Sequence, residues 1–303
     1  MRVAVTGGTG LVGQALVRAL HGDDHDVLVL SRRGNAGPGG VRTARWPGAE
    51  GGGGTWWRTL EGADAVVHLA GEPIAARRWD TAQKERIRAS RTRGTRALVE
   101  GMSQLQRPPA VLISASAVGY YGPCGDAVIH EDAPPGRDFL AEVCVAWEAE
   151  AARAEALGTR VAVLRLGLVL AAHGGALARM LLPFRLFLGG PAGTGRQWVA
   201  WIHLDDAVGL MRWLLTTPDA RGPFHATAPQ PLTNRDFSRA IGRALGRPSW
   251  LPVPAAALRL ALGEMAEALL LTGQRAVPAR ALAGGVGFRY ADADAALRAV
   301  LGR

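Results

Sequence analysis

The sequence predicts an α/β fold, in which a doubly wound parallel sheet carries a smaller C-terminal lobe. Apolar segments of strand length alternate with segments of helical periodicity over residues 1–170, which is typical of a parallel sheet covered by helices on both faces. A glycine-rich turn joins the first strand to the first helix. From residue 171 onward, short helical segments alternate with aromatic and glycine-rich ones. We therefore expect one domain over 1–170, its sheet completed by a strand near 223–228, and a lobe over 171–303 that mostly serves to bind substrate.

Each element of the first domain follows from its own pattern. Strands are short apolar runs, and helices repeat apolar residues every three or four positions. The expected strands are 1–5, 26–31, 41–46, 64–71, 111–118 and 160–170, and the expected helices are 11–20, 80–102 and 139–157. Further along the chain, Asp205 and Asp206 precede an apolar helix, which we expect them to cap.

Three glycines spaced three residues apart, Gly7, Gly10 and Gly13, follow the first strand. In a dinucleotide-binding turn the first glycine permits a tight bend, the second lets a pyrophosphate approach the backbone, and the third lets the helix pack on the strand. The helix then offers its N-terminal amides to the phosphates. A glycine-rich hairpin is the alternative, which the flanking strand and helix disfavour. The turn predicts a Rossmann domain with cofactor contacts from Gly7, Thr9, Gly10, Leu11, Val12 and Gly13.

The end of the second strand indicates which dinucleotide is bound. Proteins that select NAD carry Asp or Glu near this point, where the carboxylate binds the ribose hydroxyls. Here the strand ends in Ser31-Arg32-Arg33, and guanidinium groups suit a 2′-phosphate. Arginine supplies all but one of the 35 basic residues, so chance placement is the alternative, but the missing acid is independent of that abundance. The sequence predicts NADP(H), with Arg32 and Arg33 at the 2′-phosphate.

Composition excludes several other classes of protein. The chain has 303 residues, of which 48% are hydrophobic and 20% charged, as in an ordinary soluble enzyme. No apolar run reaches the length of about 18 residues that a membrane helix needs, and the first strand starts at once. We therefore expect no membrane segment and no signal peptide, and we place the protein in the cytoplasm.

The distribution of charge and the two cysteines limit the kinds of ligand and partner that the protein is expected to bind. The net charge of +9 is spread along helices among glutamates instead of forming a basic block, so we expect no nucleic acid. Cys124 and Cys144 are the two cysteines, and no Cys/His cluster has metal-ligand spacing, so we expect neither a disulfide nor a metal site. The expected partner is a small-molecule substrate, and a homodimer stays open.

Several segments together resemble a known family, the extended short-chain dehydrogenases/reductases. These segments are Thr6–Gly13, Val67–Gly71, Ser114–Ser116 and Trp201–Asp206. More narrowly, the chain is similar to the atypical, nucleotide-sugar-epimerase-like branch that has its own C-terminal domain. The residues that carry this are Trp79–Arg91, Ile113–Gly122, Leu181–Arg185, Gly195–His203, Ala226–Pro229 and Gly273–Pro278. The resemblance covers essentially the whole chain and implies a Rossmann fold and NADP(H).

The chain departs from that family's pattern in its catalytic residues. Members use a Tyr with a Lys four residues later, whose charge lowers the pKa of the phenol for proton transfer. None of the three tyrosines here has a lysine at that distance, and the single lysine is Lys84. Alignment on Glu148, which matches the family's glutamate, places Leu140 and Cys144 at the Tyr and Lys positions. Arg91 stands where the superfamily often has an asparagine.

Three residues remain as candidates for catalysis. Ser116 matches the family's substrate-polarising serine, or its hydroxyl is bonded to the backbone. Tyr120 or Tyr121 is a proton donor if a cation lies close, and otherwise packs a pocket wall. His68, in the middle of its strand, is expected to be a core histidine with satisfied hydrogen bonds. Further cofactor contacts are expected from the strand ends, at Leu69, Ala70, Gly71, Glu72 and Ser114.

A second group of residues is expected to bind the substrate. Lys84, as the single lysine, would contact a phosphate or carboxylate, or it lies on a solvated helix face. Arg185, Arg196 and Trp198 would form an anion-binding and aromatic pocket in the second lobe, or the tryptophan belongs to the lobe's core. The sequence thus predicts an NADP(H)-dependent oxidoreductase or epimerase-like enzyme acting on a small carbonyl or alcohol. The alternative is a non-catalytic NADPH-binding sensor or regulatory protein.

Overall fold

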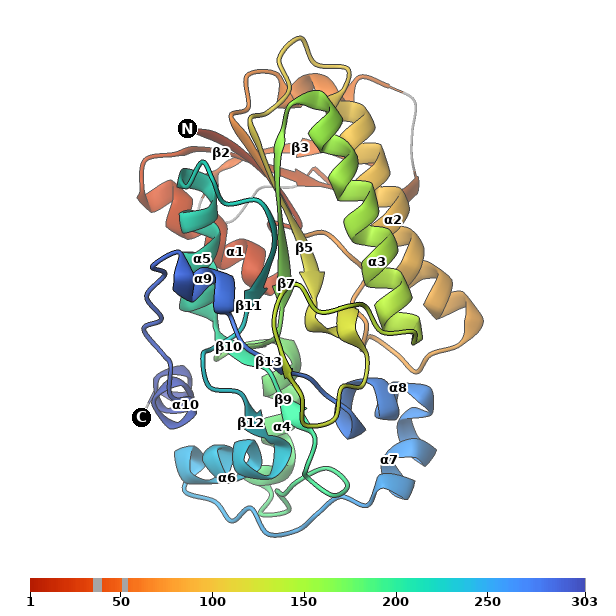
Figure 1. Cartoon of the computed structure of the whole chain (residues 1–303), viewed down its shortest axis with the longest axis vertical. Helices are drawn as coiled ribbons and strands as arrows, with labels where there is room; N and C mark the ends of the chain where they lie inside the picture. Colours follow the sequence, from red (N-terminus) through yellow and green to blue (C-terminus); the bar gives the residue numbers. More distant parts are fainter. Residues whose placement is uncertain (35–39, 51–53, 303) are drawn as a thin grey trace.

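A seven-stranded parallel sheet forms the centre of the computed structural model, which describes residues 1–34, 40–50 and 54–302 (Figure 1). The strand order is β11-β7-β5-β4-β1-β2-β3, and every neighbouring pair is parallel. The strands are β1 (Arg2–Thr6), β2 (Asp26–Ser31), β3 (Arg42–Arg45), β4 (Ala65–His68), β5 (Val111–Ala117), β7 (Arg160–Leu166) and β11 (Gly222–Ala226). The order reverses on either side of β1, as in a doubly wound sheet. The predicted fold class is confirmed.

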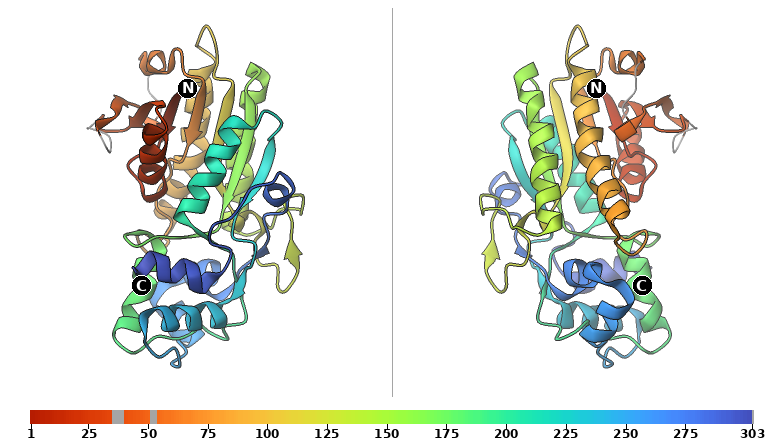
Figure 2. Two further views of the ribbon diagram at one scale, coloured as in Figure 1. Left: turned by 90° about the vertical axis from the view of Figure 1, so that its left-hand side faces the viewer. Right: turned by 90° about the vertical axis from the view of Figure 1, so that its right-hand side faces the viewer.

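Helices cover both faces of the sheet because each presents one apolar stripe. The helices α1 (Leu11–Gly22) and α5 (Leu204–Thr216) lie on one face, and α2 (Thr81–Met102) and α3 (Phe139–Ala152) lie on the other (Figure 2). Asp80 and Asp138 cap α2 and α3 by accepting N–H groups of the first turn. Two separate apolar clusters fill the space between the sheet and these layers.

Two expected elements are divided. The strand expected over 160–170 is interrupted at Gly167, after which β8 (Leu168–Leu170) leaves the sheet and pairs with β10 (Trp201–His203). A Cβ at Gly167 would lie 2.5 Å from the Ala200 carbonyl oxygen, so glycine allows this crossing of two backbones. The helix expected over 139–157 ends at Ala152 and continues as a 3₁₀ segment, η5 (Arg153–Leu157).

The cap expected for α5 is formed differently. His203 is the cap residue, and its Nδ1 accepts the Asp205 N–H at 3.1 Å. Asp206 is buried instead, and its two carboxylate oxygens accept the N–H groups of Arg289 and Tyr290 at 2.8 and 2.9 Å. The prediction that both aspartates cap the helix was wrong, because one of them connects α5 to the C-terminal segment.

The C-terminal region lies at the carboxyl ends of the sheet strands (Figure 1). Its helices are α4 (Gly175–Arg185), α6 (Asn234–Leu245), α7 (Ala255–Leu262), α8 (Glu264–Ala266), α9 (Ala279–Ala283) and α10 (Ala293–Leu301). The small strands β9 (Trp198–Val199), β12 (Leu232–Thr233), β13 (Arg275–Ala276) and β6 (Val128–Ile129) form two further pairs. A separate apolar cluster that includes Leu177, Trp201 and Phe237 holds much of this region together. No helix in the described part of the chain is long and apolar enough to span a membrane.

Candidate functional site

The glycine turn after β1 has the geometry that its sequence predicts. Gly7 has φ +69°, a left-handed conformation that favours glycine. The Gly10 N–H donates to the Gly7 carbonyl oxygen at 2.9 Å and closes the turn. A Cβ at Gly7 would lie 2.7 Å from the carbonyl carbon and oxygen of Leu69. The turn is therefore packed directly against the chain that leaves β4.

The start of α1 is open to a ligand. A Cβ at Gly13 would overlap the Gly7 carbonyl oxygen, so glycine is needed for the helix to pack on the turn. Gly10 and Thr9 are exposed, and a Cβ at Gly10 would meet only the Gly7 oxygen, at 3.3 Å. The first turn of α1 contains no acidic residue. A helix N-terminus with no side-chain cap and no competing carboxylate fits a phosphate group.

The two arginines after β2 are exposed. Neither the Arg32 nor the Arg33 guanidinium forms a hydrogen bond or ion pair with a residue that the structure describes. The Ser31 hydroxyl accepts the Gly34 N–H at 3.0 Å and shapes the bend. Both cations are therefore available to an anionic ligand beside the turn.

His68, at the end of β4, is confirmed as a core histidine. Its Nδ1 lies 2.6 Å from the Thr6 hydroxyl oxygen, and its Nε2 lies 2.9 Å from the Thr95 hydroxyl oxygen. Burial, and to a smaller extent the charge of Arg91, lowers the pKa of His68 to about 3. The imidazole is therefore neutral at physiological pH and holds β4 to β1 and α2.

The segment after β4 is fixed by α2. The Glu72 N–H donates to the Ser90 hydroxyl oxygen at 2.9 Å, and the Glu72 carbonyl oxygen accepts from Arg91 Nη1 at 3.0 Å. Gly71 is exposed. These contacts hold the backbone of the segment that follows β4, next to the glycine turn. The segment contains the expected cofactor contacts Leu69, Ala70, Gly71 and Glu72.

Ser116, at the end of β5, is bound to a carboxylate and not to the backbone. Its hydroxyl donates to Glu148 Oε1 at 2.6 Å. Arg165 Nε and Nη2 donate to the two oxygens of Glu148 at 2.9 and 2.8 Å. Because a hydroxyl has one proton, this arrangement leaves Ser116 a hydrogen-bond acceptor toward any further partner. Ser114, on the same strand, is buried.

The two adjacent tyrosines in the segment η4 (Val118–Tyr121) have different surroundings. Arg165 Nη1 donates to the Tyr121 hydroxyl oxygen at 2.6 Å, and His225 Nε2 lies 2.5 Å from that oxygen. His225 Nδ1 lies 2.8 Å from the Val277 carbonyl oxygen, which assigns the ring proton to Nδ1 and leaves Nε2 to accept the Tyr121 proton. Burial raises the pKa of Tyr121 above its ordinary value more than the attraction of Arg165 lowers it. These contacts favour a packing role for Tyr121.

Tyr120 keeps a free hydroxyl. No residue in the described ranges forms a hydrogen bond with it, and its ring is half-buried. The Arg165 guanidinium carbon lies 3.5 Å from the centre of the Tyr120 ring. Tyr120 therefore combines a free hydroxyl with a nearby cation, which is the condition under which a tyrosine here was expected to donate a proton.

The Tyr and Lys positions of the family pattern lie on α3, with Leu140 and Cys144 one turn apart and Glu148 one turn further. Leu140 is half-buried. Burial raises the pKa of the Cys144 thiol to about 11, so the thiol is protonated at physiological pH. Neither residue supplies the charge or the acid of the missing pair.

The residues expected to bind substrate are distributed over several elements. Lys84 Nζ lies 2.5 Å from Glu264 Oε2, so α2 is paired with α8. Trp198 Nε1 donates to Asp126 Oδ1 at 2.9 Å, and the Arg275 guanidinium stacks on its ring at 4.3 Å. Arg185 ends α4 and Arg196 precedes β9, and both are exposed. Their joint role in a pocket stays a prediction.

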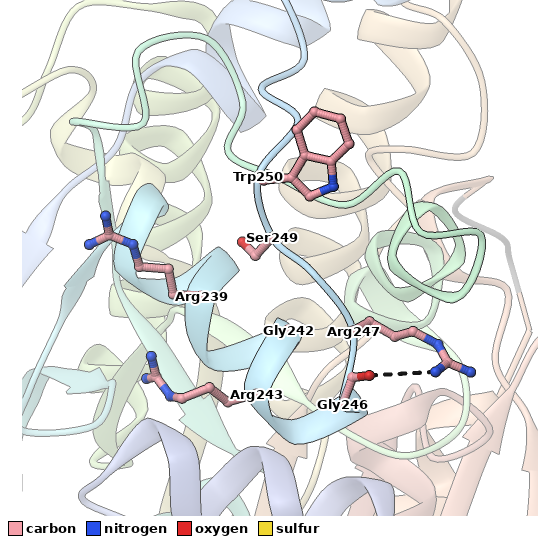
Figure 3. A pocket seen from close by; sticks show the side chains of 7 residues that line it. All are labelled: Arg239, Gly242, Arg243, Gly246, Arg247, Ser249 and Trp250. Atoms are coloured by element: carbon pink, nitrogen blue, oxygen red, sulfur yellow. Dashed lines mark hydrogen bonds between the residues drawn. The ribbon is translucent and has the colours of Figure 1, made fainter.

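A hollow of about 410 Å³ lies beside α6 in the C-terminal region (Figure 3), and no residue of the glycine turn lines it. It is lined by Arg239, Gly242, Arg243, Gly246, Arg247, Ser249 and Trp250. Arg239 and Arg243 form ion pairs with Asp236 and Asp294. Two of its three cations are therefore already neutralised, which disfavours this hollow as an anion site.

Sequence reasoning missed four residues that the structure brings to the site. Arg165 and His225 lie in apolar strands, where nothing in the local pattern distinguishes them from other polar residues. Glu148 was used only to align the family pattern, and Arg91 only as a departure from it. What they share is a charged or polar group at the end of a strand or on the sheet-facing side of a helix. This placement can be recognised only once the order of the strands in the sheet is known.

The parallel sheet, the glycine turn at β1 and the polar residues at the strand ends define the class as a Rossmann-type α/β protein. Within that class, the model of the NAD dependent epimerase/dehydratase family matches residues 3–227, and the chain belongs to this family. A domain of unknown function (DUF1731) matches residues 253–300. The resemblance to an epimerase-like branch with its own C-terminal domain is confirmed.

Relatives match over nearly the whole chain. The chloroplastic epimerase family protein SDR39U1 homolog of Arabidopsis thaliana is 43% identical over 306 residues, which cover 99% of this chain and 87% of the relative. The crystal structure of human epimerase family protein SDR39U1 (isoform 2) with NADPH has a TM-score of 0.86 at 34% identity, with 100% of both chains covered. A nucleoside-diphosphate sugar epimerase from Corynebacterium glutamicum has a TM-score of 0.80 at 35% identity, covering 100% of this chain and 58% of the other.

Proposed function

We propose that the chain binds NADP(H) at the carboxyl edge of its sheet. The observation that carries this proposal is the open glycine turn at the start of α1, together with two arginines after the neighbouring strand β2 that form no ion pair with the described residues. The human relative that was solved with NADPH supports it. Gly7, Gly10 and the N-terminus of α1 would hold the pyrophosphate, and Arg32 and Arg33 the 2′-phosphate.

Calorimetric titration with NADPH and NADH tests the cofactor. We expect the wild-type chain to bind NADPH more tightly, and the double variant Arg32→Gln, Arg33→Gln to lose about tenfold or more of that affinity, since charge-assisted hydrogen bonds to the phosphate are removed. Binding of NADH should not change. Arg42→Gln is the matched control, because Arg42 pairs with Asp26 at the opposite end of β2. Tighter binding of NADH than of NADPH by the wild type would contradict the assignment.

We further propose an NADP(H)-dependent oxidoreductase or epimerase-like activity on a small carbonyl or alcohol. NADP(H) supplies the hydride when bound. Ser116 would contact the substrate oxygen, and its bond to Glu148 leaves it ready to accept a hydrogen bond from an alcohol. Toward a carbonyl, the same hydroxyl would first have to turn away from Glu148. Tyr120, which has a free hydroxyl and whose ring packs against Arg165, would transfer the proton.

The two tyrosines allow a matched test of this role. A panel of aldehydes, ketones and enones is offered with NADPH, and the loss of nicotinamide absorbance is followed. We expect Tyr120→Phe to lower kcat by about a hundredfold to ten-thousandfold, the range of general acid catalysis. Tyr121→Phe should mainly lower stability, because Arg165 and His225 lose a partner. Equal kcat values for wild type and Tyr120→Phe would rule out the proton-transfer role.

A non-catalytic NADPH sensor is the second candidate, favoured by Leu140 and Cys144 at the positions of the family's acid and cation. It predicts tight NADPH binding without turnover of any substrate in the panel, together with a protein partner that is captured only when cofactor is present. Turnover abolished by Ser116→Ala would instead support the enzyme. Substrate contacts by Lys84, Arg185, Arg196 and Trp198, a cytoplasmic location and a homodimer stay predictions.

A further inference from the structure

The segment that connects β4 to α2, residues 73–80, lies between the sheet domain and the C-terminal region. None of these residues is buried. The segment follows Glu72, whose backbone is held by α2, and it ends at Asp80, the cap of α2. In Figure 1 it runs from the sheet edge toward α8 and then turns back into α2. This β4–α2 connection therefore borders the candidate site and the C-terminal region at once.

One side of the β4–α2 connection is bound to α4. Arg179 Nη1, on α4, donates to the Ala75 carbonyl oxygen at 2.5 Å. The start of α4 lies against the start of α1, because a Cβ at Gly175 would be 2.9 Å from Leu11 Cδ2. The glycine turn is packed against Leu69, which follows β4. The glycine turn, the chain that leaves β4 and the helix α4 thus form a closed ring of contacts at the carboxyl edge of the sheet.

The other side of the β4–α2 connection is bound to α7 and α8. Arg78 Nη1 donates to the Leu260 carbonyl oxygen at 3.3 Å. Lys84, near the start of α2, lies with its Nζ 2.5 Å from Glu264 Oε2, and the two side chains are 30% and 53% exposed. Exposed contacts of this kind contribute little free energy. The C-terminal region is therefore held to the connection by contacts that part easily.

The β4–α2 connection itself belongs firmly to the sheet domain. Trp79 Nε1 donates to the Ile74 carbonyl oxygen at 2.7 Å, which closes the connection on itself. The Trp79 ring packs edge-on against Phe139 at the start of α3, with 5.3 Å between the ring centres. When the ring of contacts opens, we therefore expect the C-terminal region to move away from the connection.

We propose that the three contacts made by Arg179, Arg78 and Lys84 form a gate for the nicotinamide half of NADP(H). This inference rests on the proposed function, which places the 2′-phosphate after β2 and the pyrophosphate after β1. Because β4 and β5 are the next strands of the sheet, the nicotinamide half extends over their ends, inside the closed ring of contacts. Parting of the three contacts gives it a way in and out. Such a gate sets the rate of exchange more than the affinity.

The rates of NADPH exchange test the gate. Stopped-flow fluorescence gives the association rate, and displacement by excess NADP⁺ gives the dissociation rate. Weaker gate contacts raise the open fraction of the free and of the bound protein alike, so both rates should rise while Kd changes less than about twofold. We expect Arg179→Gln and Glu264→Gln each to raise both rates by about two- to fivefold, as for an exposed contact. The two factors should multiply in the double variant.

The pair of Lys84 and Glu264 separates a gate from a direct ligand contact. Since these residues bind each other, Lys84→Gln, Glu264→Gln and their combination should raise both rates by the same factor. A faster dissociation and a weaker Kd in Lys84→Gln alone would assign Lys84 to the ligand and contradict its part in the gate. Arg93→Gln, which breaks an exposed ion pair with Glu85 on the same helix, is the matched control and should exchange NADPH like wild type.

A second ligand shows which half of the cofactor passes the gate. Adenosine 2′,5′-bisphosphate has no nicotinamide half, so its exchange rates should stay at the wild-type values in every gate variant. Thermal melting verifies that the variants are folded. Unchanged NADPH rates in Arg179→Gln and Glu264→Gln, or equal acceleration of both ligands, would overturn the gate and leave NADP(H) binding intact. A wild type that binds no NADPH would overturn the proposed function together with the gate.

Discussion

At the residue scale, burial decides what each polar side chain can do. His68 and Tyr121 are both enclosed, and each has its polar atoms bound to other side chains. Desolvation lowers the pKa of His68 and raises the pKa of Tyr121, so it favours the neutral form of both groups. Tyr120, one residue away, keeps a free hydroxyl. Neighbouring residues of the same type therefore take structural and candidate chemical roles according to their contacts.

The lowered pKa of His68 predicts a loss of stability in acid. The folded-state pKa of about 3 lies below the ordinary value of 6.5, so between these values the unfolded chain binds a proton that the folded chain does not. Stability is therefore complete above pH 6.5 and falls as pH decreases, by about 1.4 kcal/mol per unit, or about 2 kcal/mol between pH 6.5 and 5. Urea denaturation at several pH values measures this dependence.

The variant His68→Gln should have a shallower pH dependence than the wild type, because it lacks this titrating group. His173→Gln, at an exposed histidine, is the matched control and should follow the wild type. Identical slopes for wild type and His68→Gln between pH 6.5 and 5 would show that His68 is protonated in the folded state.

At the element scale, single side chains connect elements that are distant in the sequence. Glu148 on α3 joins Ser116 on β5 to Arg165 on β7. Asp206 on α5 holds the backbone of Arg289 and Tyr290. These contacts fix the sheet edge against its helices and the C-terminal segment against α5, so the strand ends that form the candidate site are held from several sides.

Two adjacent aspartates provide a test of this connection. Asp206→Asn places an amide N–H against a backbone N–H, and we expect it to lower the free energy of unfolding by about 2 kcal/mol, the range for a hydrogen bond to a charged group. Asp205→Asn should change the free energy of unfolding by less than about 0.5 kcal/mol. The Asp205 side chain is exposed, and its carboxylate lies 3.7 Å from His203 Nδ1, which is beyond hydrogen-bond distance. Urea denaturation compares them, and equal losses would contradict the role of Asp206.

At the scale of the whole molecule, the C-terminal region covers the carboxyl edge of the sheet (Figure 1). Lys84 and Arg78, from the α2 side, contact Glu264 and the Leu260 carbonyl oxygen of that region. The Lys84–Glu264 pair is partly exposed and contributes little stability by itself. Its position matters more, because it brings the single lysine to the boundary between the sheet domain and the region expected to bind substrate.

Much of the fold could be predicted from the sequence because it depends on local patterns. The glycine turn and the positions of the strands and of α1, α2 and α3 depend on residues close in the chain. The division of the expected strand 160–170 at Gly167 was not predicted. It depends on the close approach of the Ala200 backbone, and nothing in the sequence around Gly167 indicates that contact. The same limit explains the error at Asp206, whose partners lie more than 80 residues away.

The sequence by itself determined the parallel α/β fold, the phosphate-binding turn, the arginines suited to a 2′-phosphate and the absence of the Tyr/Lys pair. Periodicity, backbone conformation and residue identity are local properties, and they are sufficient for these conclusions. Only the tertiary structure decided which polar groups meet: Ser116 with Glu148, Tyr121 with His225, and Arg91 with the strand end beside the turn. Such contacts depend on strand order and burial, which set both the distance between groups and the cost of leaving a charge unpaired.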